Sequence, residues 1–188
     1  MKILWVNPNF LHPTTKGGQI RTLEMLRCLH RDHEIHYVAF ADPANPEGPP
    51  RAGEYSTRAY PIPHQPPARG SAGFALQAAL ALFSPLPMAV SRWHSRAMSE
   101  QVGALLREHR FDSVVCDFLA PAPNFPSLRG CVLFQHNVET VIWRRHAETA
   151  KGALRRAYFG LQARRMESYE RAVCQAAEHV IAVSETDA

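Results

Sequence analysis

Apolar positions near the start of the chain change from a continuous run to a helical spacing. Residues 2–10 form a short run rich in β-forming residues, which is typical of a strand buried on both faces. In residues 20–29 the apolar side chains recur at the spacing of one helix face. A loop with a glycine pair, Gly17 and Gly18, joins the two. This order predicts the opening unit of a parallel α/β sheet, whose ligand site lies where loops leave the carboxyl ends of the strands.

The alternation of strand and helix patterns continues along the chain. Further strands are predicted at residues 34–40, 55–62, 111–118, 131–135 and 179–183. The strand at 55–62 is an edge strand closed by prolines. Further helices are predicted at 92–109 and 152–177, and mobile or irregular connections at 42–51 and 64–73. The order predicts an α/β fold, a Rossmann-like doubly wound parallel sheet, and 188 residues fit one domain spanning 1–188.

Residues 74–83 are the most apolar segment of the chain, and a Ser-Pro-Leu-Pro sequence ends any helix there. One interpretation is an ordinary core helix. The other is a surface helix that docks on a membrane, with a basic region nearby. No apolar run reaches the ~20 residues that are needed to span a bilayer.

The charge of the chain limits which partners are expected, and its cysteines indicate the cellular location. The net charge of +4 and pI of about 9.1 suit anionic substrates or membrane surfaces and do not by themselves indicate nucleic acid. We interpret the basic region as a solvated face and expect no nucleic-acid partner; the alternative is a nucleic-acid surface with steep salt dependence. Its residues are Arg144, Arg145, Lys151, Arg155, Arg156, Arg164 and Arg165. The four cysteines are widely spaced along the chain, which indicates reduced thiols in the core. The chain enters a strand at once and shows no signal peptide. Both observations lead us to expect a cytoplasmic location.

The glycine loop has a definite chemical use. The pair Gly17 and Gly18 lets a ligand approach the main chain closely. The helix that follows offers free amide hydrogens and a positive dipole end, which suit a phosphate or a sugar hydroxyl. The alternative is a tight turn with nothing bound, because the loop matches neither the dinucleotide nor the P-loop fingerprint.

Polar side chains follow several of the predicted strands. His136, Asn137 and Glu139 come directly after the strand at 131–135. Asn7 ends the first strand, and Asp117 ends the strand at 111–118. Because the carboxyl ends of parallel strands share one edge of the sheet, we expect these groups to converge with the glycine loop. The alternative for the histidine is a residue that caps the next helix, and the convergence favours a site.

The chain resembles the N-terminal half of a family-4 glycosyltransferase of GT-B architecture over nearly its whole length. The matching segments are Lys-Ile-Leu-Trp-Val-Asn-Pro, Lys-Gly-Gly-Gln-Ile-Arg, Phe-Asp-Ser-Val-Val-Cys-Asp, Leu-Phe-Gln-His-Asn-Val-Glu and His-Val-Ile-Ala-Val-Ser-Glu. The resemblance implies two Rossmann-like domains that face each other, with the acceptor held by the first and a nucleotide-sugar donor mainly by the second. It implies that Gly17 and Gly18 lie near the donor diphosphate and that His136 lies near the transferred sugar.

The implied activity is retaining transfer of a sugar from a nucleotide-sugar to a sugar or lipid-linked acceptor, as in polysaccharide or glycolipid assembly. The implied enzyme is a hexosyltransferase whose donor-binding domain lies outside this chain, and the isolated chain is expected to be inactive. We assign a catalytic role to His136. The expected substrate- or diphosphate-binding residues are Gly17, Gly18, Gln19, Asn7, Asn137, Glu139 and Asp117. The resemblance implies no cofactor, and the absence of an Asp-x-Asp motif fits transfer without a metal ion.

The competing function is a non-catalytic Rossmann-like module that binds a nucleotide or a sugar. The family also carries a donor-side Glu-x7-Glu motif in its second domain. Glu100 to Glu108 and Glu170 to Glu178 share that spacing but lie in predicted helices of the first domain. We interpret both pairs as solvated helix faces. A peripheral contact with the inner face of a membrane is a further expectation.

Overall fold

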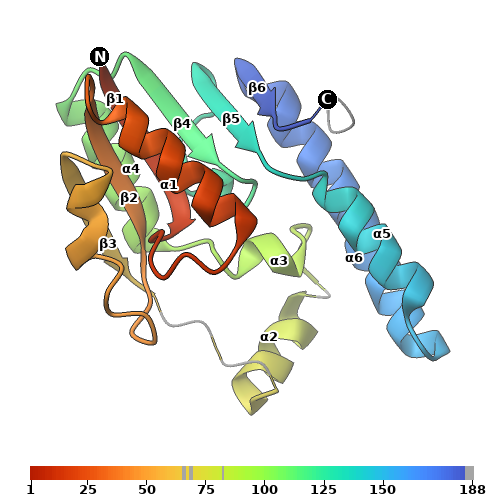
Figure 1. The fold of residues 1–188 in the computed structure, drawn as a ribbon. Helices are drawn as coiled ribbons and strands as arrows, with labels where there is room; N and C mark the ends of the chain where they lie inside the picture. The colour runs from red at the N-terminus through yellow and green to blue at the C-terminus, as the bar shows by residue number, and fades with distance from the viewer. Residues whose placement is uncertain (65–66, 68–69, 82, 185–188) are drawn as a thin grey trace.

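The structure is a computed structural model and describes residues 1–64, 67, 70–81 and 83–184. Within these residues the chain forms one six-stranded, wholly parallel sheet in the order β3-β2-β1-β4-β5-β6 (Figure 1). The strands are β1 Lys2–Asn9, β2 Glu34–Ala41, β3 Arg58–Pro63, β4 Ser113–Asp117, β5 Cys131–Gln135 and β6 His179–Ala182. The order runs outward from β1 in one direction and from β4 in the other, so the switch point lies between these two strands. The predicted Rossmann-like doubly wound sheet is confirmed.

Helices cover both faces of the sheet. They are α1 Gly17–Leu29, α2 Ala72–Ala81, α3 Met88–Ser91, α4 Arg96–Glu108, α5 Glu139–Thr149 and α6 Ala153–Ala176, with 3-10 turns η1 Pro50–Glu54 and η2 Ala122–Asn124. Alternate residues of β1 enter different cores, since Trp5 packs in the cluster that contains Leu26 of α1 and Leu4 in the cluster that contains Met98 of α4. This alternation is why the first strand reads as a continuous apolar run.

Most element boundaries fall close to those predicted, and three expectations are corrected. Pro61 does not close the edge strand β3 but pairs within it opposite Ala39 of β2, whereas Pro63, opposite Ala41, is the last residue of the strand, as predicted. An edge strand tolerates proline because it needs ladder hydrogen bonds on one side only. The helix predicted at 92–109 begins at Arg96. In the connection predicted at 64–73, residues 65–66 and 68–69 lie outside the described residues, and α2 already begins before its end.

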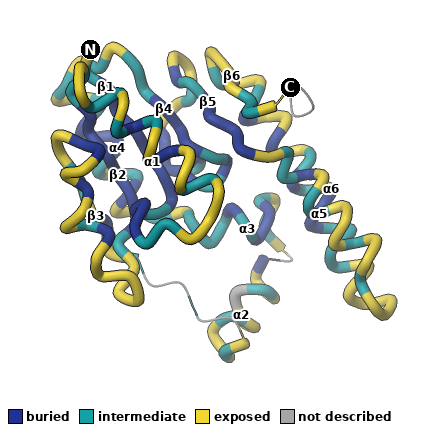
Figure 2. Tube along the Cα trace, viewed as in Figure 1, coloured by how far each residue is buried: buried dark blue, intermediate teal, exposed yellow. Residues whose placement is uncertain are grey.

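Helix α2 is not a core helix. Leu76 and Leu80 are 61% and 63% exposed, and Phe83 just beyond the helix is 89% exposed. Figure 2 shows α2 set apart from the buried strands, beyond the carboxyl end of the sheet. The core-helix interpretation of residues 74–83 is therefore wrong, because this apolar segment lies on the surface with only part of one side covered.

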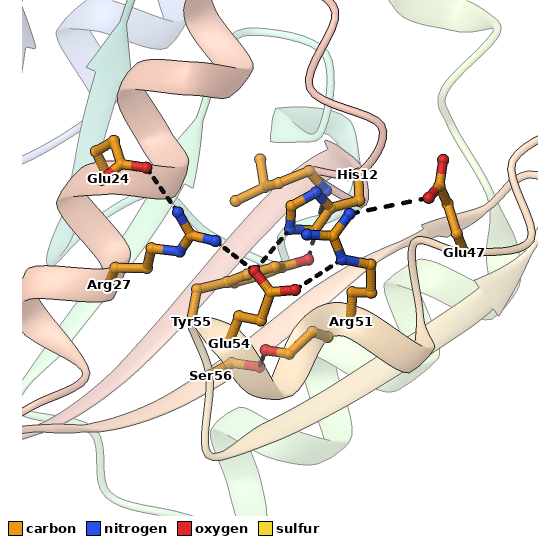
Figure 3. A network of polar contacts seen from close by, with 10 residues as sticks. His12, Glu24, Arg27, Glu47, Arg51, Glu54, Tyr55 and Ser56 are labelled. Carbon is orange, nitrogen blue, oxygen red and sulfur yellow. Dashed lines mark hydrogen bonds and ion pairs between the residues drawn. The ribbon is translucent and has the colours of Figure 1, made fainter.

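The loop after β1 is anchored by a polar network at its outer end (Figure 3). Glu54 accepts hydrogen bonds from Arg51 at 2.7 Å and from Arg27 of α1, and its Oε2 lies 3.2 Å from Nε2 of His12. Hydrogen bonds from Arg51 and Arg27 lower the pKa of the Glu54 carboxyl to about 2. The backbone N–H of Leu11 donates to the hydroxyl of Tyr55. The network ties the loop that leads to the glycine pair against α1 and η1.

The four cysteines form no disulfide. Cys116 and Cys131 are buried, as predicted, and burial raises the pKa of both thiols. Cys28 is exposed, which corrects the expectation that all four lie in the core. It lies on the solvent side of α1, two residues after the buried Leu26.

Candidate functional site

A cleft of about 1200 Å³ lies at the carboxyl edge of the sheet. Its polar end is formed by the end of β1, the start of α1 and the segment that follows β5. The segments after β4 and β6, together with α2, α3, α5 and α6, form the rest of its walls. Seven of the eight predicted site residues line it. They are Asn7, Gly17, Gly18, Gln19, His136, Asn137 and Glu139. Parallel strands therefore bring to one place side chains that are up to 132 positions apart, from Asn7 to Glu139.

The eighth residue, Asp117, is completely buried behind the cleft. Its Oδ1 accepts a hydrogen bond from Nε2 of His136 at 2.9 Å. Its Oδ2 accepts from Asn7 Nδ2 at 2.6 Å, from Trp5 Nε1 at 2.9 Å and from Thr22 Oγ1 at 3.2 Å. The oxygens of Asp117 are engaged by protein donors, and Asp117 does not line the cleft. This geometry favours a positioning role and does not support the expectation that it binds substrate or diphosphate directly.

The imidazole of His136 is held on three sides. Its ring stacks on Phe118 with centroids 4.1 Å apart and meets the edge of Phe134 at 4.5 Å. A carboxylate oxygen can only accept, so Nε2 donates to Asp117, and in the neutral tautomer with this hydrogen Nδ1 is a hydrogen-bond acceptor. Among the described residues, this buried Nδ1 has no hydrogen-bond partner. An unpaired buried acceptor costs free energy, so Nδ1 is the ring atom with unused hydrogen-bonding capacity.

The bonds of His136 do not support a helix-capping role. Its described side-chain partners are Asp117 and Thr22, and neither belongs to α5. The start of α5 is instead capped by Glu170 of α6, which accepts from the backbone N–H of Glu139 and of Thr140, both at 3.0 Å. Glu170 is 8% exposed, so the interpretation of this glutamate as a solvated residue is wrong.

The two glycines of the loop differ in what they require. A side chain at Gly18 would begin 3.2 Å from the ring of Phe118 and 3.5 Å from Nδ1 of His136, whereas one at Gly17 would meet open space. Gly18 is therefore needed for close approach to the histidine. The side chain of Gln19 accepts from the N–H of Thr15 at 3.2 Å, so its carbonyl oxygen closes the loop.

The cleft has an apolar arm that the sequence analysis did not find. It runs between α2 and α3 on one side and the α5–α6 hairpin on the other. Its aromatic wall contains Trp93, Trp143, His146, Tyr158 and Phe159. The rings of Trp143 and His146 lie 6.1 Å and 5.8 Å from that of Phe159. The sequence signal is weak, since it consists of two aromatic rings three residues apart on α5 and an aromatic pair on α6.

Charge around the cleft is mixed. Lys16 and Arg21 line the end near the glycine loop. Glu139 also lines the cleft, and burial and then the charge of Glu170 raise the pKa of its carboxyl. Part of the basic region of α5 and α6 is paired, since Arg144 lies 2.8 Å from Glu167.

Two absences concern only the residues that the structure describes. No group of three or more His, Cys, Asp or Glu side chains in them is placed to hold a metal ion. None of the helices there combines the length and the apolar character that crossing a membrane requires.

The fold and the cleft together define a Rossmann-like α/β domain with a large cleft at its topological switch point. No family model matches the sequence, and a search of curated proteins found no match. Two similar solved structures are a UDP-glucosyltransferase from Polygonum tinctorium capable of glucosylating indoxyl, in complex with 3,4-dichloroaniline, and a UGT transferase from Siraitia grosvenorii in complex with UDP. Their sequence identities are 9% and 13% and their TM-scores 0.48 and 0.43, over 97% of this chain. The chain spans about half of each, 46% and 50%, and at this distance neither assigns a function.

Proposed function

We propose that this domain is the acceptor-side half of a GT-B glycosyltransferase, which works with a second, donor-binding domain. The reaction is transfer of a hexose from a nucleotide-sugar to a sugar or lipid-linked acceptor, as in polysaccharide or glycolipid assembly. One observation carries the proposal. A single cleft joins the uncovered start of α1 and the unpaired Nδ1 of His136 at one end to an aromatic arm at the other.

The polar end suits the diphosphate of a nucleotide-sugar. The first amides of α1 begin at Gly17 and Gly18, and the N-cap residue Lys16 makes no side-chain capping bond there. Helix amides and the positive charges of Lys16 and Arg21 would stabilise the negative charge that develops on the leaving diphosphate. The proposal includes transfer without a metal ion, so EDTA should leave the rate unchanged.

The imidazole of His136 is suited to bind a hydroxyl group of a substrate. With Asp117 holding its Nε2 hydrogen, His136 offers Nδ1 as an acceptor for a hydroxyl of the acceptor or of the transferred sugar. Holding that hydroxyl in a fixed position in the site lowers the entropic part of the barrier. Retention of configuration, which the sequence resemblance implies, remains a prediction. NMR of the anomeric proton of the product tests this stereochemistry. We assign no role as a general base to Glu139.

The test uses the protein in which this domain is joined to its donor domain. Incubated with nucleotide-sugars and with sugar and lipid-linked acceptors, it should produce a glycosylated acceptor. The 188-residue chain alone should give no transfer, because it supplies one wall of the cleft between the domains. Transfer by the isolated chain would contradict the two-domain proposal. Saturable nucleotide-sugar binding by the joined protein, with no transfer to any acceptor, would favour the non-catalytic binding module.

A lipid-linked acceptor would bring the domain to a membrane, and α2 is the element placed for such a contact. Leu76 and Leu80 of this helix are exposed, and the α5–α6 hairpin, which carries the basic region, lines the same cleft with other residues. Basic residues near an anionic leaflet contribute about 1 kcal/mol each, and apolar side chains can insert beside them. We propose a cytoplasmic protein that binds peripherally at the inner face of the membrane.

Leu80→Glu is expected to reduce co-sedimentation with anionic liposomes at least tenfold at low salt, because it places a negative charge in the contact. The matched control is Ile20→Glu, which changes an exposed residue of α1 that is 50% accessible, against 63% for Leu80. Equal loss in both variants, or no binding of the folded wild-type protein to anionic vesicles, would remove the membrane contact and leave an acceptor that arrives from solution.

A further inference from the structure

The carboxylate of Glu170 is held by four hydrogen-bond donors that come from both ends of one short segment. Oε1 accepts from the backbone N–H of Glu139 at 3.0 Å and from the side-chain amide of Gln135 at 3.3 Å. Oε2 accepts from the backbone N–H of Thr140 at 3.0 Å and from its hydroxyl at 2.5 Å. Gln135 precedes residues 136–138 and Glu139 follows them, so one carboxylate clamps the segment that enters the cleft.

Capping of α5 does not by itself account for this arrangement. The N-cap residue of α5 is Val138, which makes no side-chain capping bond, and a serine or aspartate there would satisfy the helix locally. Instead, a carboxylate from 31 positions further along the chain is buried beside Glu139, another carboxyl. Burying a charge is costly unless it is fully paired, and a like charge nearby adds to the cost. The burial of the Glu170 carboxylate is explained if residues 136–138 must be held in a fixed position in the cleft.

The neighbouring residue of α6 holds the other half of the site. The hydroxyl of Tyr169 donates to the backbone carbonyl of Leu119 at 3.2 Å, two residues after Asp117. Consecutive residues of α6 therefore hold the segment after β4 and the segment after β5. These two segments carry Asp117 and His136, whose side chains bond to each other at 2.9 Å.

We propose that Glu170 is a positioning residue, which fixes the imidazole of His136 and the side chain of Asn137 in the cleft by clamping both ends of residues 136–138. Its effect on turnover rests on the proposed function, whereas its effect on the geometry of His136 does not. Loss of the clamp should leave the fold intact, because α6 keeps Met166 and Val173 in the core.

The test compares two isosteric substitutions on the same helix. Glu170→Gln keeps the size of the side chain but replaces one acceptor oxygen by an NH₂ group that faces donors. Glu167→Gln, one turn earlier, removes the surface pairing with Arg144 and Arg171 and is the control. NMR of the ¹⁵N-labelled histidine rings of the whole chain reports the surroundings of His136, whose signals are assigned with His136→Gln.

Glu170→Gln is expected to shift both ring-nitrogen signals of His136 and to lower the pKa of the Glu139 carboxyl, because a neighbouring negative charge is gone. Glu167→Gln should change neither. In the joined, two-domain enzyme, Glu170→Gln should reduce kcat about 10- to 100-fold with little change in KM, since a misplaced group acts mainly on the transition state.

Unshifted His136 signals in the folded Glu170→Gln protein would overturn the proposal, whatever the activity. If that variant does not fold, Thr140→Val takes its place, because it removes only the hydroxyl donor to the same carboxylate; shifted signals support the proposal and unshifted signals overturn it. Shifted signals with an unchanged kcat would overturn the catalytic part. A wild-type enzyme that transfers no sugar would instead count against the proposed function, and the NMR result would stand independently.

Discussion

Replacing Asp117 with alanine is expected to lower the free energy of unfolding by about 3–5 kcal/mol, because it leaves several buried donors unpaired at once. The side chains of Trp5, Asn7, Thr22 and His136 all donate to this carboxylate, and Asp117 is 0% exposed. They come from β1, α1 and the segment after β5, so the substitution weakens the junction of these elements with β4.

Urea unfolding of the whole chain measures this loss. The matched control is Asp112→Ala, which removes an exposed carboxylate that accepts from the backbone N–H of Lys2 at 2.6 Å. A surface change of this kind should cost no more than about 1 kcal/mol. Equal losses for the two variants would show that the buried hydrogen bonds of Asp117 contribute little to stability. If Asp117→Ala does not fold, Asp117→Asn, which keeps one acceptor oxygen, should fold with an intermediate loss.

The sheet and the polar end of the cleft could be predicted because both follow from local pattern. The strand at 131–135 was placed to the residue, since a continuous apolar run is followed at once by polar groups. Once the sheet is known to be parallel, Asn7, Asp117 and His136 must lie at the same edge. No long-range information is needed for that step.

The partners of these residues could not be predicted, because they depend on how distant elements pack. Nothing local separates Glu170, which is buried at the start of α5, from Glu167, which lies on the surface one turn earlier. The glycine pair gives no sign that only Gly18 approaches the imidazole. Residues 74–83 are a further example, because the apolar composition of a helix does not by itself say whether other elements pack over it.

Burial also changes which substitution tests the histidine best. The side chain of His136 is 2% exposed and packed between Phe118 and Phe134. Alanine would leave a cavity and an unpaired oxygen on Asp117, so lost stability would be confused with lost catalysis. Glutamine keeps an amide hydrogen that can donate to Asp117 and fills most of the same space. It removes the aromatic nitrogen Nδ1, the atom that we assign to the hydroxyl of a substrate.

In the two-domain enzyme that we propose, His136→Gln is therefore expected to lower kcat about 100-fold or more while the melting temperature falls by only a few degrees. The control is His94→Gln, an exposed histidine outside the cleft, which should leave both quantities unchanged. A His136→Gln enzyme with turnover close to that of the wild type would show that the buried imidazole only joins β4 to β5. A large drop in melting temperature together with normal turnover would assign His136 to stability alone. A selective loss of turnover, by contrast, would require Nδ1 to meet the substrate, because the bond to Asp117 is retained in the variant.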